Sequence, residues 1–156
     1  MTTQSFSLYT KNGYAGDLVD SAPAVKQTGI LTSASVGFGK AVKRDTSVEQ
    51  GVAVGGAAKV FAITAREYNH EAGTRPSTGN DTFYLVTESV SLVREGYLYV
   101  LLGGAVAVSA GQVLHVDTVT GVFSKTAVAG NVVATTNVVA EEAGIAGDVI
   151  KVRIDI

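Results

Sequence analysis

The side chains that could do chemistry in this chain of 156 residues are few, and they lie far apart in the sequence. The two histidines are His70, in a polar stretch beside Glu67 and Glu71, and His115, within the apolar run QVLHVD. His70 could serve as a metal ligand or an acid–base group, but polar loop clusters usually face solvent. His115 fits a half-buried position on a strand. One histidine in each of two distant segments does not give the spacing of a metal site.

Carboxylates occur as short clusters, at Asp17 and Asp20, at Asp81, and at Glu141 and Glu142. None of them has the ligand spacing of a calcium loop. A pair of carboxylates could in principle hydrolyse a glycosidic bond, but the chain has no tryptophan and only six tyrosines to hold a sugar. No serine lies in a GxSxG turn, and no glycine run is followed by a Lys-Ser or Lys-Thr pair. We therefore expect a protein that is not an enzyme and that needs neither a metal nor a cofactor.

Composition excludes several other classes of function. The formal net charge is −2 and no basic block exists, so a nucleic-acid partner has little electrostatic support. The longest apolar stretch, residues 100–116, is broken by glycine, serine, glutamine and histidine, so we expect no membrane-spanning helix. The N-terminal residues are polar and lack the apolar centre of a secretory signal. There is no cysteine, which excludes disulfides and thiol chemistry.

The elements that must position any functional residue are short strands. Eighteen glycines, only two prolines and abundant valine favour strands joined by tight turns. The clearest block is REGYLYVLLGGAVAVSAGQVLHVDTVTGVFS, residues 94–124, which predicts three or four strands folded back on one another. Tyr97, Tyr99 and Leu101 alternate with apolar residues on the other side, so we expect this strand to be covered on both faces.

The rest of the chain continues this pattern. Further strands are predicted over residues 36–43, 59–66, 83–86, 90–93, 128–139 and 148–156, with a loop over 44–58 and an exposed polar excursion over 67–82. About eight to ten strands indicate an all-β fold, a single compact antiparallel barrel or sandwich of jelly-roll type. Residues 1–33 have no clean periodicity and are predicted to form an extended N-terminal arm with at most one short strand. Residues 34–156 then form the β-domain.

Several blocks, in order along the chain, resemble the structural cement proteins of tailed bacteriophages, which decorate the capsid. They are GYAGDLVDSAP, FGKAVKRDT, VFAITAREY, the block over residues 94–124, and EEAGIAGDVIKVRI. Two positions depart from the family pattern, because Asp45 and Ala62 stand where glycine is common. The similarity spans nearly the whole chain.

This resemblance implies a virion protein that binds the outer surface of the head, bridges neighbouring major capsid subunits and stabilises the shell. Its partners would be the major capsid protein and other copies of itself, as a dimer or trimer, and it would be made in the host cytoplasm. The apolar anchors expected on the arm are Tyr9, Tyr14, Leu18, Val19, Pro23 and Val25. The loop contacts expected on the excursion, which would face solvent or a neighbouring copy, are Tyr68, His70 and Arg75.

Other interpretations stay open from the sequence. The anchors of the arm could instead pack on their own barrel, because interface anchors and satellite core residues look alike in a sequence. The chain could also be a β-rich binding module of an extracellular assembly, associated with an adhesin, a pilus or a tail. A third interpretation of the sequence is a small β-barrel hydrolase.

Overall fold

The computed structural model describes residues 13–19, 22–66, 83–125 and 130–155. Strands, turns and loops make up these ranges, and they contain no helix that could cross a membrane. The predicted all-β fold is therefore confirmed. Most of the strands join into one nine-stranded sheet, and the remaining two, β2 (Val36–Gly37) and β6 (Phe83–Tyr84), form a small second sheet.

The first half of the sheet closes on itself. Its strands pair in the order β1, β4, β3, β5 and β7, and β7 pairs back with β1. The closing pair is long, running from Ala24 opposite Gly96 to Ile30 opposite Ser89. Strands β1 and β4 run parallel, so the sheet is mixed rather than purely antiparallel. The bounds are β1 (Ala24–Leu31), β3 (Ala41–Arg44), β4 (Gly51–Val54), β5 (Ala62–Thr64) and β7 (Ser89–Leu101).

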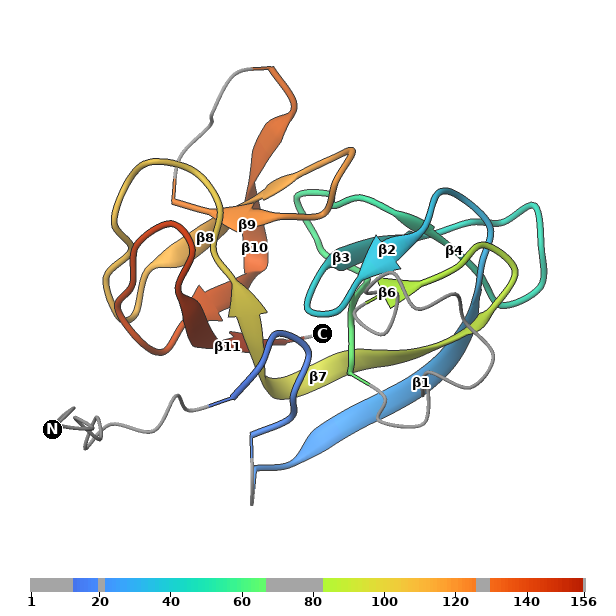
Figure 1. Cartoon of the computed structure of the whole chain (residues 1–156), viewed down its shortest axis with the longest axis horizontal. Coiled ribbons are helices and arrows are strands. Elements are labelled where there is room, and N and C mark those ends of the chain that lie inside the picture. The colour runs from blue at the N-terminus through green and yellow to red at the C-terminus, as the bar shows by residue number, and fades with distance from the viewer. Residues whose placement is uncertain (1–12, 20–21, 67–82, 126–129, 156) are drawn as a thin grey trace, which may run out of the picture.

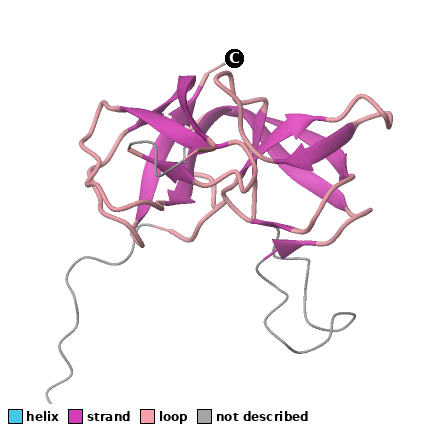
Figure 2. Ribbon diagram, turned by 90° about the horizontal axis from the view of Figure 1, so that it is seen from above, coloured by secondary structure: helices cyan, strands magenta, loops and turns pink. Residues whose placement is uncertain are grey.

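The second half uses the other end of β7. From there the sheet continues through β11, β10, β8 and β9. A parallel bridge between Leu102 and Phe123, with the Gly103 N–H donating to the Phe123 carbonyl at 2.8 Å, brings β9 back beside the end of β7. The two halves therefore share β7, which runs from one to the other in Figure 1. Figure 2 shows the two groups of strands side by side. The bounds are β8 (Val113–Asp117), β9 (Phe123–Ser124), β10 (Val132–Ala140) and β11 (Val149–Ile154).

The buried apolar residues form two hydrophobic cores, and β7 contributes to both. Val90 and Leu92 lie in the smaller core with Leu31 and Tyr84. Leu98 and Val100 lie in the larger core, which is built mainly from the second half and also takes in Ala41 of β3 and Ile63 of β5.

Regular alternation would place Leu92 and Leu98, six residues apart, on the same face of β7, so the change of core needs an irregularity in the strand. The register with β1 supplies one, because it shifts between Val25, opposite Glu95, and Lys26, opposite Val93. A 13-residue strand that supplies both cores fixes the two halves to each other.

The sequence prediction is wrong in three places. Residues 44–58 are not all loop, because Gly51–Val54 forms β4 between β1 and β3. The two strands expected over 90–93 and 97–102 are one continuous strand, since Gly96 adopts a φ of 124° and the chain passes through it without a turn. Within the block over residues 94–124, the apolar residues after Gly103 and Gly104 were expected to continue as a strand, but Val106 belongs to no strand and Val108 forms an isolated bridge with Gly144.

The arm was predicted to contain at most one short strand. It contains one, β1, but this strand is eight residues long. On β11 the predicted alternation is confirmed, because Ile150, Val152 and Ile154 are buried and the residues between them are half-buried. The double coverage expected for β7 is confirmed at Tyr99, which is buried, and fails at Leu101, which is 38% exposed.

Candidate capsid-contact surfaces

The end of the arm that the structure describes runs along an edge of β7. The Gly16 N–H donates to the Tyr99 carbonyl at 2.7 Å, and the Tyr99 N–H donates to the Asp17 carbonyl at 2.9 Å. Leu18 forms a bridge with Leu98, and its side chain packs against the larger core. Val19 is half-buried beside it. Leu18 thus serves the chain's own core, so a capsid contact through this side chain stays a prediction.

Tyr14, by contrast, is held at the surface. It is 59% exposed, and the guanidinium of Arg66 lies 4.6 Å from the centre of its ring. The Tyr14 N–H donates to the Asp17 carboxylate at 2.9 Å, which fixes the turn that carries the ring. A cation over an aromatic face is attractive at this distance. The ring is therefore ordered before any partner arrives, and this lowers the entropic cost of a contact.

Pro23 and Val25 line an open groove of about 310 Å³ where β1 meets β7 and β11. Pro23 is exposed, and Val25 is 47% exposed. The polar groups in this groove are Glu95, Tyr97, Arg153 and Asp155. These four residues were not predicted as contact residues from the sequence, because they come from β7 and from the end of the chain at β11, which are distant in the sequence.

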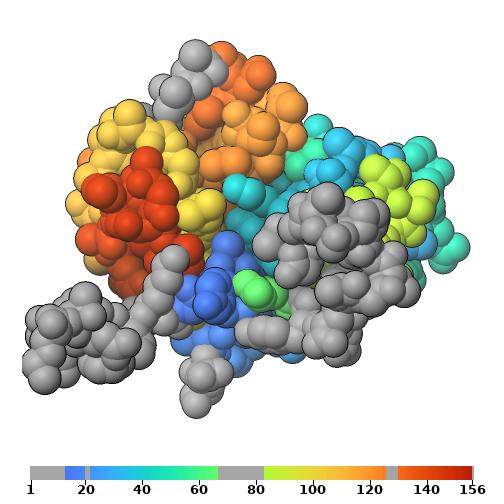
Figure 3. Space-filling view, viewed as in Figure 1, coloured from blue at the N-terminus to red at the C-terminus, as the bar shows by residue number. Residues whose placement is uncertain are grey.

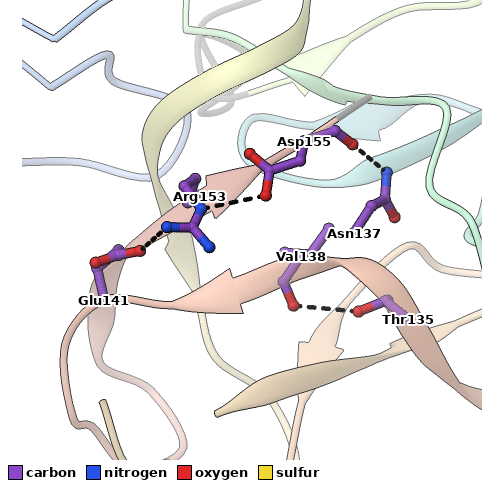
Figure 4. A network of polar contacts seen from close by, with 6 residues as sticks. All are labelled: Thr135, Asn137, Val138, Glu141, Arg153 and Asp155. Atoms are coloured by element: carbon purple, nitrogen blue, oxygen red, sulfur yellow. Dashed lines mark hydrogen bonds and ion pairs between the residues drawn. The ribbon is translucent and has the colours of Figure 1, made fainter. Parts of the chain in front are cut away.

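Arg153 is the most tightly held of these polar groups. Its guanidinium lies 3.2 Å from Asp155 and 3.5 Å from Glu141, as Figure 4 shows. The pKa of Arg153 is raised above its ordinary value by a hydrogen bond with Tyr97 and then by the charge of Asp155. The groove therefore has an apolar rim at Pro23 and Val25. On its floor, the positive charge of Arg153 is balanced by Asp155 and Glu141.

A second exposed apolar surface lies at the far end of β1. The β1-end patch consists of Ile30, Val48, Leu85 and Val86, which are 36% to 43% exposed. Two turns bring these residues together, because the Ile30 N–H donates to the Gln50 carbonyl at 2.9 Å and the Leu31 N–H donates to the Glu88 carbonyl at 3.0 Å.

Both turns of the β1-end patch contain a strained residue. Gln50 has a φ of 59° and Thr87 a φ of 72°, and they are the two non-glycine residues with positive φ in the described part of the chain. A β-branched residue such as threonine is an outlier in this region. Strain of this kind is retained at functional sites more often than elsewhere. The turns are therefore candidates for contact with a partner.

A third apolar surface lies at the opposite end of the long axis, as Figure 1 shows. The loop-pair patch consists of residues 104–107 (GAVA) and 143–147 (AGIAG), which contain no charged side chain. The loops are joined where the Val108 N–H donates to the Gly144 carbonyl at 2.8 Å. Val106 is 43% exposed and Ile145 is 60% exposed. In the space-filling view the two loops form one continuous surface (Figure 3).

Four of the predicted contact residues, Tyr9, Tyr68, His70 and Arg75, lie outside the described residues. The β1-end and loop-pair patches were missed from the sequence. Their apolar residues occur singly in turns, and a sequence does not show which turns meet at one end of the fold. Over the ranges that the structure describes, no group of three or more His, Cys, Asp or Glu side chains could hold a metal ion.

Comparison with known proteins identifies the family. A family model described as "Structural cement protein (E217 gp24/Pam3 gp6)" matches residues 1–155. The fold is similar to a chain in a solved structure entitled "The capsid of Myoviridae Phage XM1", with a TM-score of 0.68 and 15% sequence identity, over 99% of this chain and 97% of that one. No curated protein matches. Because the family model spans almost the entire sequence, the chain belongs to the structural cement proteins of bacteriophage capsids.

Proposed function

We propose that this cement protein binds the outer surface of the phage head and bridges neighbouring major capsid subunits. The observation that carries the proposal is the pair of uncovered apolar patches at opposite ends of one body (Figure 1). A bridging protein needs two separate contact surfaces, and an end-to-end arrangement lets each of them reach a different subunit. The shared strand β7 holds the ends at a fixed separation.

Each patch is small, so neither would bind tightly alone. Once one patch is bound, however, the second binds at a high effective concentration, and the combined affinity rises by orders of magnitude. A protein that binds only the assembled lattice also stabilises that lattice by mass action. Two weak contacts on a rigid body therefore favour binding to the shell over binding to isolated capsid subunits.

The N-terminal segment is the third contact in this proposal. Tyr14 and Val25 are exposed and held in place, and together with Tyr9, Val19 and Pro23 they are the anchors on this side. Leu18 would support them from the core. Association with other copies, as a dimer or trimer, is part of the same proposal.

The experiment is co-sedimentation of purified protein with expanded heads that lack it, followed by thermal melting of the heads. Two double variants each add charge to one patch, Leu85→Glu with Val86→Glu and Val106→Glu with Ile145→Glu. Val119→Glu is the matched control, because Val119 is 57% exposed on a turn outside both patches. Tyr14→Ser tests the N-terminal contact, and sedimentation equilibrium of the free protein gives its oligomeric state.

We expect each double variant to lose about tenfold or more in affinity for heads, which corresponds to about 1.4 kcal/mol. Each should also lose the rise in head melting temperature that the wild type and Val119→Glu produce. If only one patch matters, the protein decorates the shell without bridging its subunits. If neither matters, both patches are wrong as contact surfaces.

A further inference from the structure

A cationic cleft lies apart from the three surfaces described above. It has a volume of about 170 Å³ and is lined by Lys59, Val60, Phe61 and Arg94. The guanidinium of Arg94 lies 4.2 Å from the centre of the Phe61 ring, and that of Arg44 lies 6.0 Å from the same centre. Two guanidiniums therefore lie over one aromatic ring, and Lys59 lines the same cleft.

These charges have no ion-pair partner among the residues that the structure describes, because no salt bridge there includes Arg44, Lys59 or Arg94. Arg94 donates one hydrogen bond, from Nη1 to the Gln27 side chain at 3.0 Å, but its buried Nε has no hydrogen-bond partner. Because this Nε is closed to solvent, an incoming ligand would pair with the terminal nitrogens of the Arg94 guanidinium and with Lys59 rather than with Nε.

Part of the wall of the cleft is already engaged within the fold. The backbone N–H and carbonyl of Val60 are both used by the side chain of Asn137, each at 2.9 Å. The nearest acidic residues along the chain face other partners, because Glu95 lines the groove at Pro23 and Asp155 pairs with Arg153 at 3.2 Å. Among the described residues, no acidic side chain forms an ion pair with Arg94 or Lys59.

We propose that the cleft between Lys59 and Arg94 binds the carboxylate of an acidic side chain, Asp or Glu, from a protein partner in the shell. The volume is below the range of about 300–1,000 Å³ that is typical for small-molecule sites, so it suits one side chain. An arginine fork pairs with a carboxylate through two parallel hydrogen bonds. The formal net charge of −2 disfavours a polyanion such as nucleic acid as the partner.

This inference rests on the proposed binding to the shell, and the first test uses the same co-sedimentation assay. Lys59→Glu reverses one charge at an exposed position, and Arg94→Gln removes the fork. Lys43→Glu, at an exposed position on β3 outside the cleft, is the control with the same change in net charge as Lys59→Glu. We expect Lys59→Glu and Arg94→Gln each to weaken binding about tenfold at low salt, and the loss to shrink as salt screens the charges.

The outcomes separate the two proposals. If wild-type protein does not bind heads, the proposed function fails. If wild type binds and the cleft variants bind equally well, only the cleft fails. Because Arg94→Gln could lower stability, the second test uses folded wild-type protein, with backbone amide NMR shifts of Lys59, Phe61 and Arg94 recorded during titration with acetate and, separately, with inorganic phosphate. Shifts that saturate with acetate at lower concentration support the proposal, whereas a stronger response to phosphate or none to either anion overturns it.

Discussion

The side chain of Asn137 and the backbone of Val60 hold each other through a reciprocal pair of hydrogen bonds across 77 residues of sequence. The Val60 N–H donates to Asn137 Oδ1, and Asn137 Nδ2 donates to the Val60 carbonyl, both at 2.9 Å. Asn137 Nδ2 also donates to the Asp155 carbonyl at 2.9 Å (Figure 4). One amide on β10 therefore joins the residues that precede β5 to the end of β11.

Replacing this amide should destabilise the protein strongly. Asn137→Ala leaves backbone groups of Val60 and Asp155 without their partners, and we expect the free energy of unfolding to fall by about 3 kcal/mol. The melting temperature should fall by roughly 10 °C. Asn131→Ala is the control, because Asn131 is exposed and directly precedes β10. Equal melting temperatures for the two variants would show that the amide is not important.

Gly121, in the turn after β8, packs closely against Ala41 of strand β3. Its φ is 70°, and a Cβ built there would overlap the carbonyl oxygen of Ala41. The Ala41 N–H also donates to the Gly121 carbonyl at 2.9 Å. We therefore expect Gly121→Ala to cost about 2 kcal/mol through overpacking, beyond the backbone strain of an alanine at positive φ.

Gly111 provides the matched control for this prediction. Its φ is 81°, close to that of Gly121, but a Cβ there would meet nothing within 4 Å. Gly111→Ala therefore carries the backbone strain without the steric overlap. Urea unfolding of the two variants measures the difference, and equal losses in the two would refute the close approach.

Asp45 should make stability depend on pH in the acidic range. Its pKa is lowered from 3.8 to about 2, first by the Ser47 hydroxyl, then by Thr32 and by the Ser47 backbone N–H. A carboxylate with a lowered folded-state pKa stabilises the protein above its unfolded-state pKa, and this contribution disappears as pH falls from about 4 to about 2. We expect Asp45→Asn to be less stable than wild type at pH 7 and to lose less stability between pH 4 and 2.

The Ser47→Ala variant tests the assigned cause of this shift. It removes the hydroxyl that donates to Asp45 at 2.6 Å and leaves the carboxylate in place. The carboxyl pKa of Asp45, followed by NMR, should then rise toward 3.8. A titration curve identical to that of wild type would mean that the Ser47 hydroxyl does not hold the pKa down.

Single strands and turns could be predicted from the sequence, but the pairing of strands that lie far apart in the chain could not. The alternation on β11 and the turn residues around Gly121 identified their elements, because periodicity and turn chemistry are local properties. Strand β4 was missed because GVAV lies among glycines and polar residues, and it is a strand only through pairing with β1 and β3. The closure of both halves on β7 depends on contacts between residues far apart, which periodicity does not encode.

For the contact surfaces, too, local sequence led to the family but not to the individual residues. The blocks of glycine, valine and alanine that resemble cement proteins led to the family, and the family model confirms it. Individual contact residues could not be predicted in this way. Leu18 and Val25 look equivalent in the sequence, but Leu18 packs on the core and Val25 is exposed. Which of the two is buried depends on pairing with β7, which lies far away in the sequence.

The shared strand β7 also determines how the protein would carry a mechanical load. If the shell pulls the two end patches apart, the force runs mainly along β7, and the hydrogen bonds on both of its edges resist in shear. Bonds loaded in shear must break together, whereas bonds at a peeled edge break one after another. A pull between residues 48 and 145 should therefore need more force than a pull that peels β9 from β8. A protein built in this way would resist forces that pull neighbouring subunits of the shell apart.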